Sequence, residues 1–250
     1  MIDSHSHLDD SSFNSDLIEV IERAKQKLSA VITLSDSLAS NEKNLRISEE
    51  FLGFVFPCFG LGPITTLRES KLSQVISFIE ENHEKMVAVG EVGLDYYWDK
   101  ENHGRQKENF TKFIELANDL NKPLVIHSRN AEEDALKMAE RGAATQVIMH
   151  SFEASSDLIK RAVDNGFFIG VTTKALYSRK TKDLIKEIEL DYLLTETDSP
   201  YLNPFNRKER NEPVNVSELI ALIASELGIT FEEASKATEK NTVKAFDLKI

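Results

Sequence analysis

The sequence predicts an α/β fold of the (β/α)8 barrel type, a TIM barrel, with residues 1–250 forming a single domain. The first observation is that short apolar, β-branched segments alternate with amphipathic helical segments. The second is that eight such strand segments fit into about 200 residues, as a barrel requires. The third is that no linker, repeat or low-complexity tract divides a chain of ordinary length for one α/β barrel.

The first half of the chain supplies four strands. Residues 30–35, AVITLS, are apolar and β-branched, as expected of a buried parallel strand. Leu17, Ile21 and Ala24 recur at helical spacing and share one face. The strands are predicted over residues 1–3, 30–35, 53–60 and 86–91, and the helices over 16–28, 38–51 and 72–84.

The second half continues the alternation. Phe110, Phe113 and Ala117 mark the clearest helix by their spacing, and Gly142 and Gly166 are typical of helix C-termini. The strands are predicted over 124–128, 146–151, 167–171 and 192–197, and the helices over 106–120, 131–141, 155–165, 180–188, 215–227 and 231–245. A doubly wound open sheet is the alternative fold, but it usually has a Gly-rich first turn. HSHLDD stands there instead, which favours the barrel.

Composition limits the classes of function. The net charge of −12 argues against a protein that coats nucleic acid non-specifically, because such binding depends on phosphate neutralisation. No signal peptide and no apolar run long enough for a membrane span is visible. The single cysteine, Cys58, fits a reducing compartment. We therefore expect a cytoplasmic protein with no membrane association, and nothing indicates an obligate protein partner.

Six residues of metal-ligand type follow apolar strand segments: His5, His7, Glu91, His127, His150 and Asp198. The carboxyl ends of barrel strands meet at one face, where catalytic groups lie. The two remaining histidines lie in connections. We expect His83 to have no functional role, because it precedes a strand, and His103 to be solvated.

His5 and His7 are one residue apart, so in a strand both imidazoles point to the same side. Imidazole and carboxylate ligands together suit Zn²⁺, Mn²⁺, Fe²⁺ or Co²⁺, and also Mg²⁺ where carboxylates and waters dominate. Six ligands exceed the four of a tetrahedral site, so we expect two divalent ions with a bridging carboxylate. A His-x-His pair alone is weak support; the inference depends on five strand ends carrying such residues together.

Several motifs, in this order, carry a family resemblance: DSHSHLD, GEVGLDYY, PLVIHSR, HSF, ETDSPYL and RNEPVNV. They resemble the TatD-type metal-dependent deoxyribonucleases, a family of amidohydrolase-like TIM-barrel hydrolases, from Asp3 to about Phe246. The resemblance implies that the six residues are the metal ligands and that Glu91 is shared between two ions. It also implies hydrolysis of DNA phosphodiester bonds, commonly as a 3′-to-5′ exonuclease on single strands, with Mg²⁺ as the usual assay metal.

The chain departs from the family pattern near the substrate. The family commonly has Gly-x-His-Pro after the third strand, and Gly62 stands where that histidine would be. The usual HCFSG is HSFEAS here, so Ser151 replaces cysteine and Glu153 adds a charge that would repel a nearby phosphate. Substrate contacts are therefore less secure than the ligand set.

Roles can be assigned to the acids. Glu91 and Asp198 are the expected catalytic carboxylates, with Asp198 orienting the attacking water and accepting its proton. Glu196 lies two residues earlier and either supports the ligands or takes part directly. Asp3 and Asp9 are expected to orient the imidazoles, and Asp9 could instead cap the following turn.

Substrate-binding candidates lie in loops at the barrel mouth. Arg129 could contact a phosphate or form a surface salt bridge, and Tyr96 could stack a base or pack the rim. The alternatives given for Tyr96 apply also to Tyr97 and Trp98. Four further cations could supply positive charge near the rim and draw in a strand: Arg105, Arg207, Lys208 and Arg210. RNEP, residues 210–213, is expected to fix the loop before the penultimate helix.

Two other classes of function remain open. A small-molecule amidohydrolase or phosphoesterase would use a similar metal pair, often with a modified lysine as the bridge, but Glu91 occupies that place here. A binding or scaffold protein with a dead site would have lost at least one ligand, and all six are present. The nuclease with a single-stranded DNA substrate is therefore the preferred hypothesis.

Overall fold

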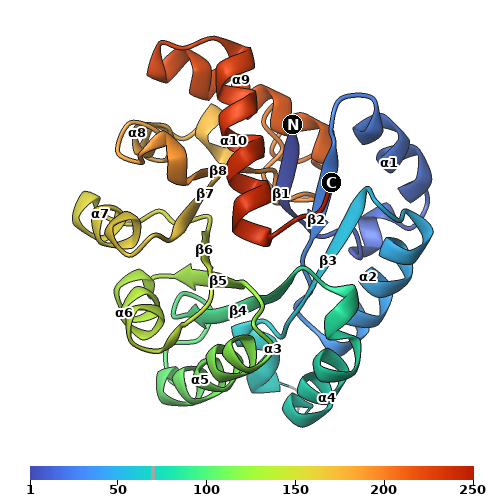
Figure 1. Cartoon of the computed structure of the whole chain (residues 1–250), viewed down its shortest axis with the longest axis vertical. Coiled ribbons are helices and arrows are strands. Elements are labelled where there is room, and N and C mark those ends of the chain that lie inside the picture. Colours follow the sequence, from blue (N-terminus) through green and yellow to red (C-terminus); the bar gives the residue numbers. More distant parts are fainter. Residues whose placement is uncertain (69–70) are drawn as a thin grey trace.

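The computed structural model describes residues 1–68 and 71–250 and shows a barrel of eight strands in chain order (Figure 1). Neighbouring strands all pair in parallel. This order confirms the (β/α)8 barrel and excludes the doubly wound sheet, in which the strand order reverses. The strands are β1 Ile2–Ser6, β2 Ala30–Thr33, β3 Val55–Phe59, β4 Ala88–Asp95, β5 Leu124–Arg129, β6 Val147–His150, β7 Phe168–Thr172 and β8 Leu193–Glu196.

Helices lie between successive strands and surround the barrel (Figure 1). One short helix, α3, was not predicted; it begins with proline, which suits the first position of a helix. The helices are α1 Leu17–Lys25, α2 Leu38–Glu50, α3 Pro63–Arg68, α4 Leu72–Asn82, α5 His103–Asp119, α6 Glu132–Gly142, α7 Ser156–Asp164, α8 Arg179–Leu184, α9 Val216–Leu227 and α10 Phe231–Phe246. Short 3-10 turns occur at Ser11–Phe13, His83–Lys85, Thr173–Leu176, Leu190–Tyr192 and Pro213–Asn215.

Two strands extend three or four residues beyond their predicted C-terminal ends, and β5 and β7 extend one residue beyond theirs. β1 reaches Ser6 rather than residue 3, and β4 reaches Asp95 rather than Glu91. The prediction ended each strand where its apolar run ended, but backbone pairing continues past that point. Asp95 is still in register with Arg129 of β5. His5 and Glu91 consequently lie inside strands, which hold their side chains more firmly than loops would.

The barrel closes where β1 meets the segment after β8. The Asp198 amide donates to the His5 carbonyl at 2.9 Å, and the His7 amide donates to the Ser199 carbonyl at 2.7 Å. The buried Asp3 carboxylate accepts from the Thr197 amide at 2.8 Å and from its hydroxyl at 2.5 Å. Asp3 was expected to orient an imidazole; its carboxylate instead joins the first and last strands.

An apolar layer fills the barrel interior. It takes side chains from every strand, including Ile2, Cys58 and Phe168, and is closed by Phe246 and Leu248 beyond the last strand. A larger cluster packs the outer strand faces against the helices. The Cys58 thiol is fully buried in the inner layer, and this burial raises its pKa.

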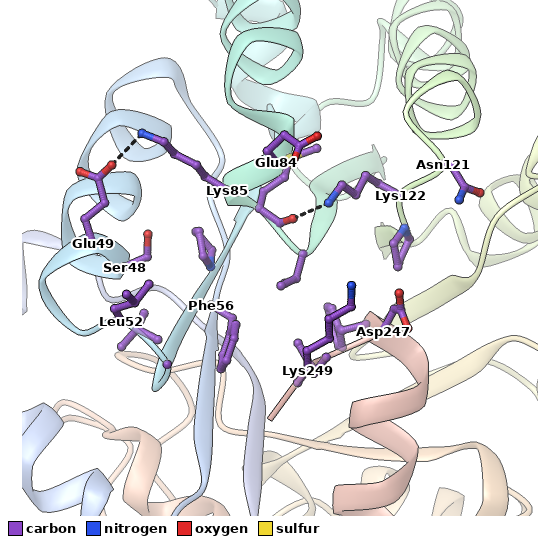
Figure 2. Close-up of a pocket in the computed structure, with 18 residues that line it drawn as sticks. Ser48, Glu49, Leu52, Phe56, Glu84, Lys85, Asn121, Lys122, Asp247 and Lys249 are labelled. Atoms are coloured by element: carbon purple, nitrogen blue, oxygen red, sulfur yellow. Dashed lines mark hydrogen bonds and ion pairs between the residues drawn. The ribbon is translucent and has the colours of Figure 1, made fainter.

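A hollow of about 550 Å³ lies at the end of the barrel where the strands begin (Figure 2). Segments that precede β3, β4 and β5 line it together with the C-terminal residues. Lys85 pairs with Glu49 at 2.8 Å across one side, and Lys122 donates to the Met86 carbonyl at 2.9 Å. None of the six predicted metal ligands lies there, so this hollow is separate from the face where barrel chemistry occurs.

In the described ranges no single helix is long and apolar enough to cross a membrane. One pair, Pro213–Leu227 and Phe231–Phe246, meets the length and composition test only when the two helices are taken together, and they are bent by 114°.

Gly93 allows β4 to approach β5 closely, and Gly93→Ala should destabilise the barrel strongly. The residue has φ +139°, and a Cβ there would lie 2.1 Å from the His127 carbonyl oxygen. We expect a loss of about 3 kcal/mol or more in the free energy of unfolding, measured by denaturant titration.

Gly104→Ala is the matched control for this substitution. Apart from its chain neighbours and the backbone of its own helix, no atom of residues 1–68 and 71–250 lies within 4 Å of a Cβ at Gly104, which is in α5. The same change should therefore be neutral or raise the free energy of unfolding by up to about 1 kcal/mol. Equal stability of the two variants would contradict the close approach at Gly93.

Candidate metal centre

Six side chains converge at the carboxyl ends of the strands. His5 comes from β1, Glu91 from β4, His127 from β5 and His150 from β6. His7 directly follows β1, and Asp198 lies two residues beyond the end of β8. All six are buried or nearly so, although they arise from positions spread across almost 200 residues of sequence. The structure thus brings together the whole set that the sequence singled out.

Glu91 lies at the centre of the cluster and faces two groups of imidazoles. Its Oε2 is 3.1 Å from His5 Nε2 and 3.7 Å from His7 Nε2. Its Oε1 is 2.9 Å from His127 Nδ1. The two oxygens of one carboxylate therefore point at different imidazole nitrogens, an arrangement that fits the predicted bridging role.

Asp198 closes the cluster on the side of β1. Its Oδ1 lies 3.4 Å from His7 Nε2, 3.8 Å from His5 Nε2 and 3.9 Å from His150 Nε2. The residue has a left-handed backbone, φ +55°, a conformation that aspartate adopts more readily than most residues. Backbone hydrogen bonds on both sides hold it, from its own amide to His5 and from the Tyr201 amide to its carbonyl at 2.9 Å.

The arrangement of the ligand atoms fits divalent cations. Three groups, each with its ligand atoms within 4.8 Å of one another, could hold an ion: His5, His150 and Asp198; His5, His7 and Glu91; and Glu91, His127 and His150. His5 Nε2 and His7 Nε2 are only 3.3 Å apart and can share at most one proton. His5 Nδ1 is buried without a hydrogen-bond partner in the described part of the chain. Nitrogen and carboxylate ligands crowded in this way are the set that borderline divalent metals prefer.

The electrostatics without metal show how strongly the ligands interact. Burial disfavours the charged forms of His7 and His127, but the surrounding carboxylates outweigh it and raise their pKa values to about 10 and about 9. Burial and the neighbouring His150 lower the pKa of His5. Burial also opposes the charge on Glu91, yet His127 and His5 hold the pKa of that carboxyl well below its ordinary value. Protons therefore occupy positions that a metal ion would take.

Glu196 orients His150 from behind the cluster. It is fully buried, and its Oε2 accepts from His150 Nδ1 at 2.9 Å and from the Ser151 amide at 3.1 Å. This geometry leaves His150 Nε2 for the metal side, which favours the supporting role over direct catalysis. The carboxylate fits only because residue 170 is glycine: a Cβ there would lie 1.9 Å from Glu196 Oε1.

Asp95 has a comparable role that the sequence reasoning did not identify. Its Oδ2 lies 3.1 Å from His127 Nε2, and its Oδ1 accepts from the Tyr97 and Trp98 amides at 3.0 and 2.9 Å. One carboxylate thus fixes the imidazole of a predicted metal ligand and the start of the loop over the mouth. The available signal was its position in GEVGLD, four residues after Glu91, once β4 is taken to continue.

Asp9 contacts none of the imidazoles by a hydrogen bond. It accepts from Asn44 Nδ2 at 3.2 Å, and burial raises its pKa. The turn that it could have capped is capped by Asp10 instead, whose carboxylate accepts from the Ser12 amide. Asp9 therefore affects His7 through its charge rather than by direct contact.

The two departures from the family pattern have simple structural settings. The Gly62 amide donates to the Asp36 carbonyl at 2.9 Å, and the residue brings no side chain to the mouth. Glu153 is paired with Lys174 at 2.8 Å and accepts from the Thr181 hydroxyl. Its charge is therefore compensated locally, and the expected repulsion of a phosphate is correspondingly weaker.

The side chain of Tyr96, a predicted substrate contact, contacts Asp134 and His103. Its hydroxyl donates to Asp134 at 2.9 Å, and its ring stacks on His103 with centroids 3.6 Å apart. His103 is thus packed rather than solvated. Tyr97 and Trp98 are exposed, so they are better placed than Tyr96 to meet a base.

The predicted cations differ in their exposure and in the ion pairs that they form. Arg129 is exposed, with its Nε 4.0 Å from Asp95 Oδ2 and its guanidinium 5.9 Å from the Tyr97 ring. Arg210 is committed to Asp16 at 2.6 Å and to Glu212 at 2.9 Å. The ion pairs of Arg210 and the hydrogen bond from Asn211 to the Thr197 carbonyl confirm that residues 210–213, RNEP, fix the loop before α9.

Three predicted residues lie apart from these contacts. Arg105 and Lys208 are exposed and have no ion pair within residues 1–68 and 71–250. His83 Nδ1 lies 2.7 Å from the Glu80 carbonyl, before β4 and away from the cluster, as expected.

Gly170→Ala should weaken metal binding by displacing Glu196 and releasing His150. We expect affinity for a divalent ion to fall about tenfold to a hundredfold, measured by competition with a chelator. Combining it with Glu196→Asp, which shortens the side chain, should restore part of the affinity. Full affinity in Gly170→Ala alone would show that Glu196 does not position His150.

Comparisons with known proteins agree with this geometry. The family model described as TatD related DNase matches residues 2–247. The metal-dependent hydrolase YabD of Bacillus subtilis is 34% identical over 254 residues, with 98% of each chain covered. The deoxyribonuclease TATDN3 of Homo sapiens is 32% identical, covering 98% of this chain and 94% of the human protein.

A solved structure extends the likeness to the fold. The crystal structure of YJJV, a TatD homologue from Escherichia coli K12, matches with a TM-score of 0.91 at 28% identity, covering 100% of this chain and 98% of that one. Sequence family, fold and clustered ligands agree over nearly the whole chain. The chain therefore belongs to the TatD related DNase family and is a metal-dependent hydrolase.

Proposed function

We propose that this protein hydrolyses phosphodiester bonds of DNA and removes nucleotides from single strands in the 3′-to-5′ direction. The observation that carries the proposal is the position of Glu91, with Oε2 facing His5 and Oε1 facing His127. This geometry supports two divalent ions held close together, the arrangement used to displace an oxygen at phosphorus. The name of the human relative, deoxyribonuclease TATDN3, supports DNA as the substrate.

The six residues divide between the two proposed ions. His5, His7 and Asp198 would hold one, His127 and His150 would hold the other, and Glu91 would join them. The mixed nitrogen and oxygen ligands are compatible with Zn²⁺ and Mn²⁺ as bound metals and with Mg²⁺ as the assay metal.

Asp198 and Glu196 would have separate roles in the reaction. Bound divalent ions would supply a lowered pKa for water and stabilise charge on the phosphoryl oxygens. Asp198 would orient the attacking water and accept its proton, because its carboxylate is buried beside three imidazoles and is ionised at neutral pH. Burial alone would raise the pKa of Asp198, but His7 and His150 lower it. Glu196 would keep His150 in one tautomer throughout.

The preference for a single strand is supported by aromatic side chains exposed in the loops at the mouth, among them Tyr97 and Trp98. Unpaired bases can stack on such rings, whereas bases in a duplex cannot. We further propose that residues 1–250 act as one domain in the cytoplasm without an obligate protein partner, consistent with one buried cysteine.

Glu91→Gln should abolish metal-dependent cleavage, because the amide cannot bridge two cations. We expect the rate to fall by about a hundredfold or more on single-stranded oligonucleotides labelled at either end, with EDTA, Mg²⁺ and Mn²⁺ compared. Glu84→Gln, a highly exposed carboxylate before β4, is the matched control and should leave the rate unchanged.

The same assay shows polarity and tests the substrate class. Stepwise shortening from the 3′ end supports the proposal, and shortening from the 5′ end would reverse the polarity. A metal-loaded protein that leaves every oligonucleotide intact would overturn the nuclease and favour a small-molecule hydrolase, to be tested on phosphoesters and carboxyl esters.

Metal loading should release protons. His7 and His127, with pKa values of about 10 and about 9, are protonated at pH 7 in the metal-free protein, and a metal ligand must be neutral. Uptake of the ions at pH 7 should therefore release about two protons, measured in weak buffer, and apparent affinity should rise with pH up to about 10.

Protonation of His7 and His127 also affects the stability of the metal-free protein, which decreases as the pH rises. Because their folded pKa values lie above the ordinary 6.5, they stabilise the metal-free protein below about pH 6.5, and this contribution is lost as pH rises through 9 to 10. Metal uptake without proton release would contradict the assignment of these imidazoles as ligands.

A further inference from the structure

Exposed aromatic side chains are concentrated at the barrel mouth. Among the described residues, six large aromatic side chains are exposed: Tyr97, Trp98, Tyr177, Tyr201, Phe205 and Phe231. All but Phe231 lie in loops that follow strands, on the same face as the metal centre. Apolar rings gathered at one face of a soluble protein mark a binding surface rather than random exposure.

Two of these rings line a hollow of about 510 Å³, within the range of small-ligand pockets. Phe205 is 71% exposed and Tyr177 37% exposed. Arg207 and Lys208 complete the lining with Pro204 and Asn206, so no carboxylate lines it. The Arg207 guanidinium lies 5.5 Å from the centre of the Tyr177 ring. We refer to this feature as the rim pocket.

The loop that forms the rim pocket is held in place by its own side chains. Asn203 Oδ1 accepts from the Phe205 and Asn206 amides at 2.9 and 3.0 Å. The Thr173 hydroxyl bonds the Leu202 carbonyl at 2.7 Å and so ties the segment after β7 to the segment after β8. The pocket therefore exists before a ligand arrives, which lowers the entropic cost of binding.

The charge of the rim pocket is unusual for this chain. Arg207 and Lys208 form no ion pair within residues 1–68 and 71–250, whereas neighbouring Arg210 is paired twice. In a chain of net charge −12, two such cations beside open aromatic rings complement an aromatic ligand that carries negative charge.

The loop also connects the pocket to the metal centre. It begins at Asp198 and passes Tyr201, whose ring lies edge-on to His7 with centroids 6.1 Å apart. Burial raises the pKa of the Tyr177 hydroxyl, Arg207 opposes this effect, and Asp198 adds a smaller raising effect. The loop therefore joins the pocket along the chain to a residue of the cluster.

We propose that the rim pocket binds one base of the DNA strand, stacked on Phe205 and Tyr177, with Arg207 and Lys208 contacting the adjoining phosphates. The inference rests on the proposed nuclease function. Tyr97 and Trp98 are the weaker candidates for this role, since they pack edge-on against each other at 5.0 Å and their nearby cation, Arg129, leans toward Asp95.

The test is a cycle that combines protein variants with abasic oligonucleotides. Short single strands, each lacking one base at a successive position, are compared with the intact strand for removal of the first nucleotide. In the wild-type protein, loss of the base that occupies the pocket should raise KM about tenfold to a hundredfold, the range expected for one stacked base. In Phe205→Ala, KM for the intact strand should rise similarly, and the abasic change should have no further effect.

Two further variants test whether the effect depends on the aromatic ring at position 205. Phe205→Tyr keeps the aromatic face and should keep the sensitivity to the missing base. Phe231→Ala removes an exposed ring on α10, outside the mouth, and should behave as the wild type. Sensitivity that persists unchanged in Phe205→Ala, or that is absent at every position in the wild type, overturns the rim pocket while the nuclease stands. Failure of the wild type to cleave any oligonucleotide removes both proposals.

Discussion

The seam between β1 and β8 is the constraint on which the site depends. Barrel closure places the His5 carbonyl against the Asp198 amide and the His7 amide against the Ser199 carbonyl. Asp3 reinforces the seam by bonding Thr197. Because the first and last strands must meet, ligands almost 200 residues apart in sequence become neighbours, and closing the barrel also assembles the cluster.

The buried acids and imidazoles of the cluster stabilise one another's charges. Isolated buried carboxylates or imidazolium groups would be costly, but here each acid faces at least one imidazole. Two further acids act from behind, Glu196 on His150 and Asp95 on His127, and both also bond backbone amides. These contacts leave the imidazoles few other orientations, so the geometry of the cluster is held by the protein's own side chains.

Much of the fold and of the cluster could be predicted because both follow local rules. Apolar runs located the strands, and the six residues of metal-ligand type at or just beyond the ends of those runs lie together in the structure. What could not be predicted depends on contacts between distant segments. The continuation of β4 to Asp95 requires its pairing with Arg129, and the need for glycine at position 170 arises only from the Glu196 carboxylate on the next strand. The engagement of Tyr96 by Asp134 and His103 is equally invisible in sequence.

The placement of Cys58 has a practical consequence for studying the loops. Its thiol is the only one in the chain and lies in the inner apolar layer, with its pKa raised by burial, so little reactive thiolate forms at neutral pH. A cysteine introduced at an exposed position would then be the one thiol open to a maleimide or spin label in the native protein. Distances across the barrel mouth could be followed spectroscopically without first removing the native cysteine and disturbing the layer that it fills.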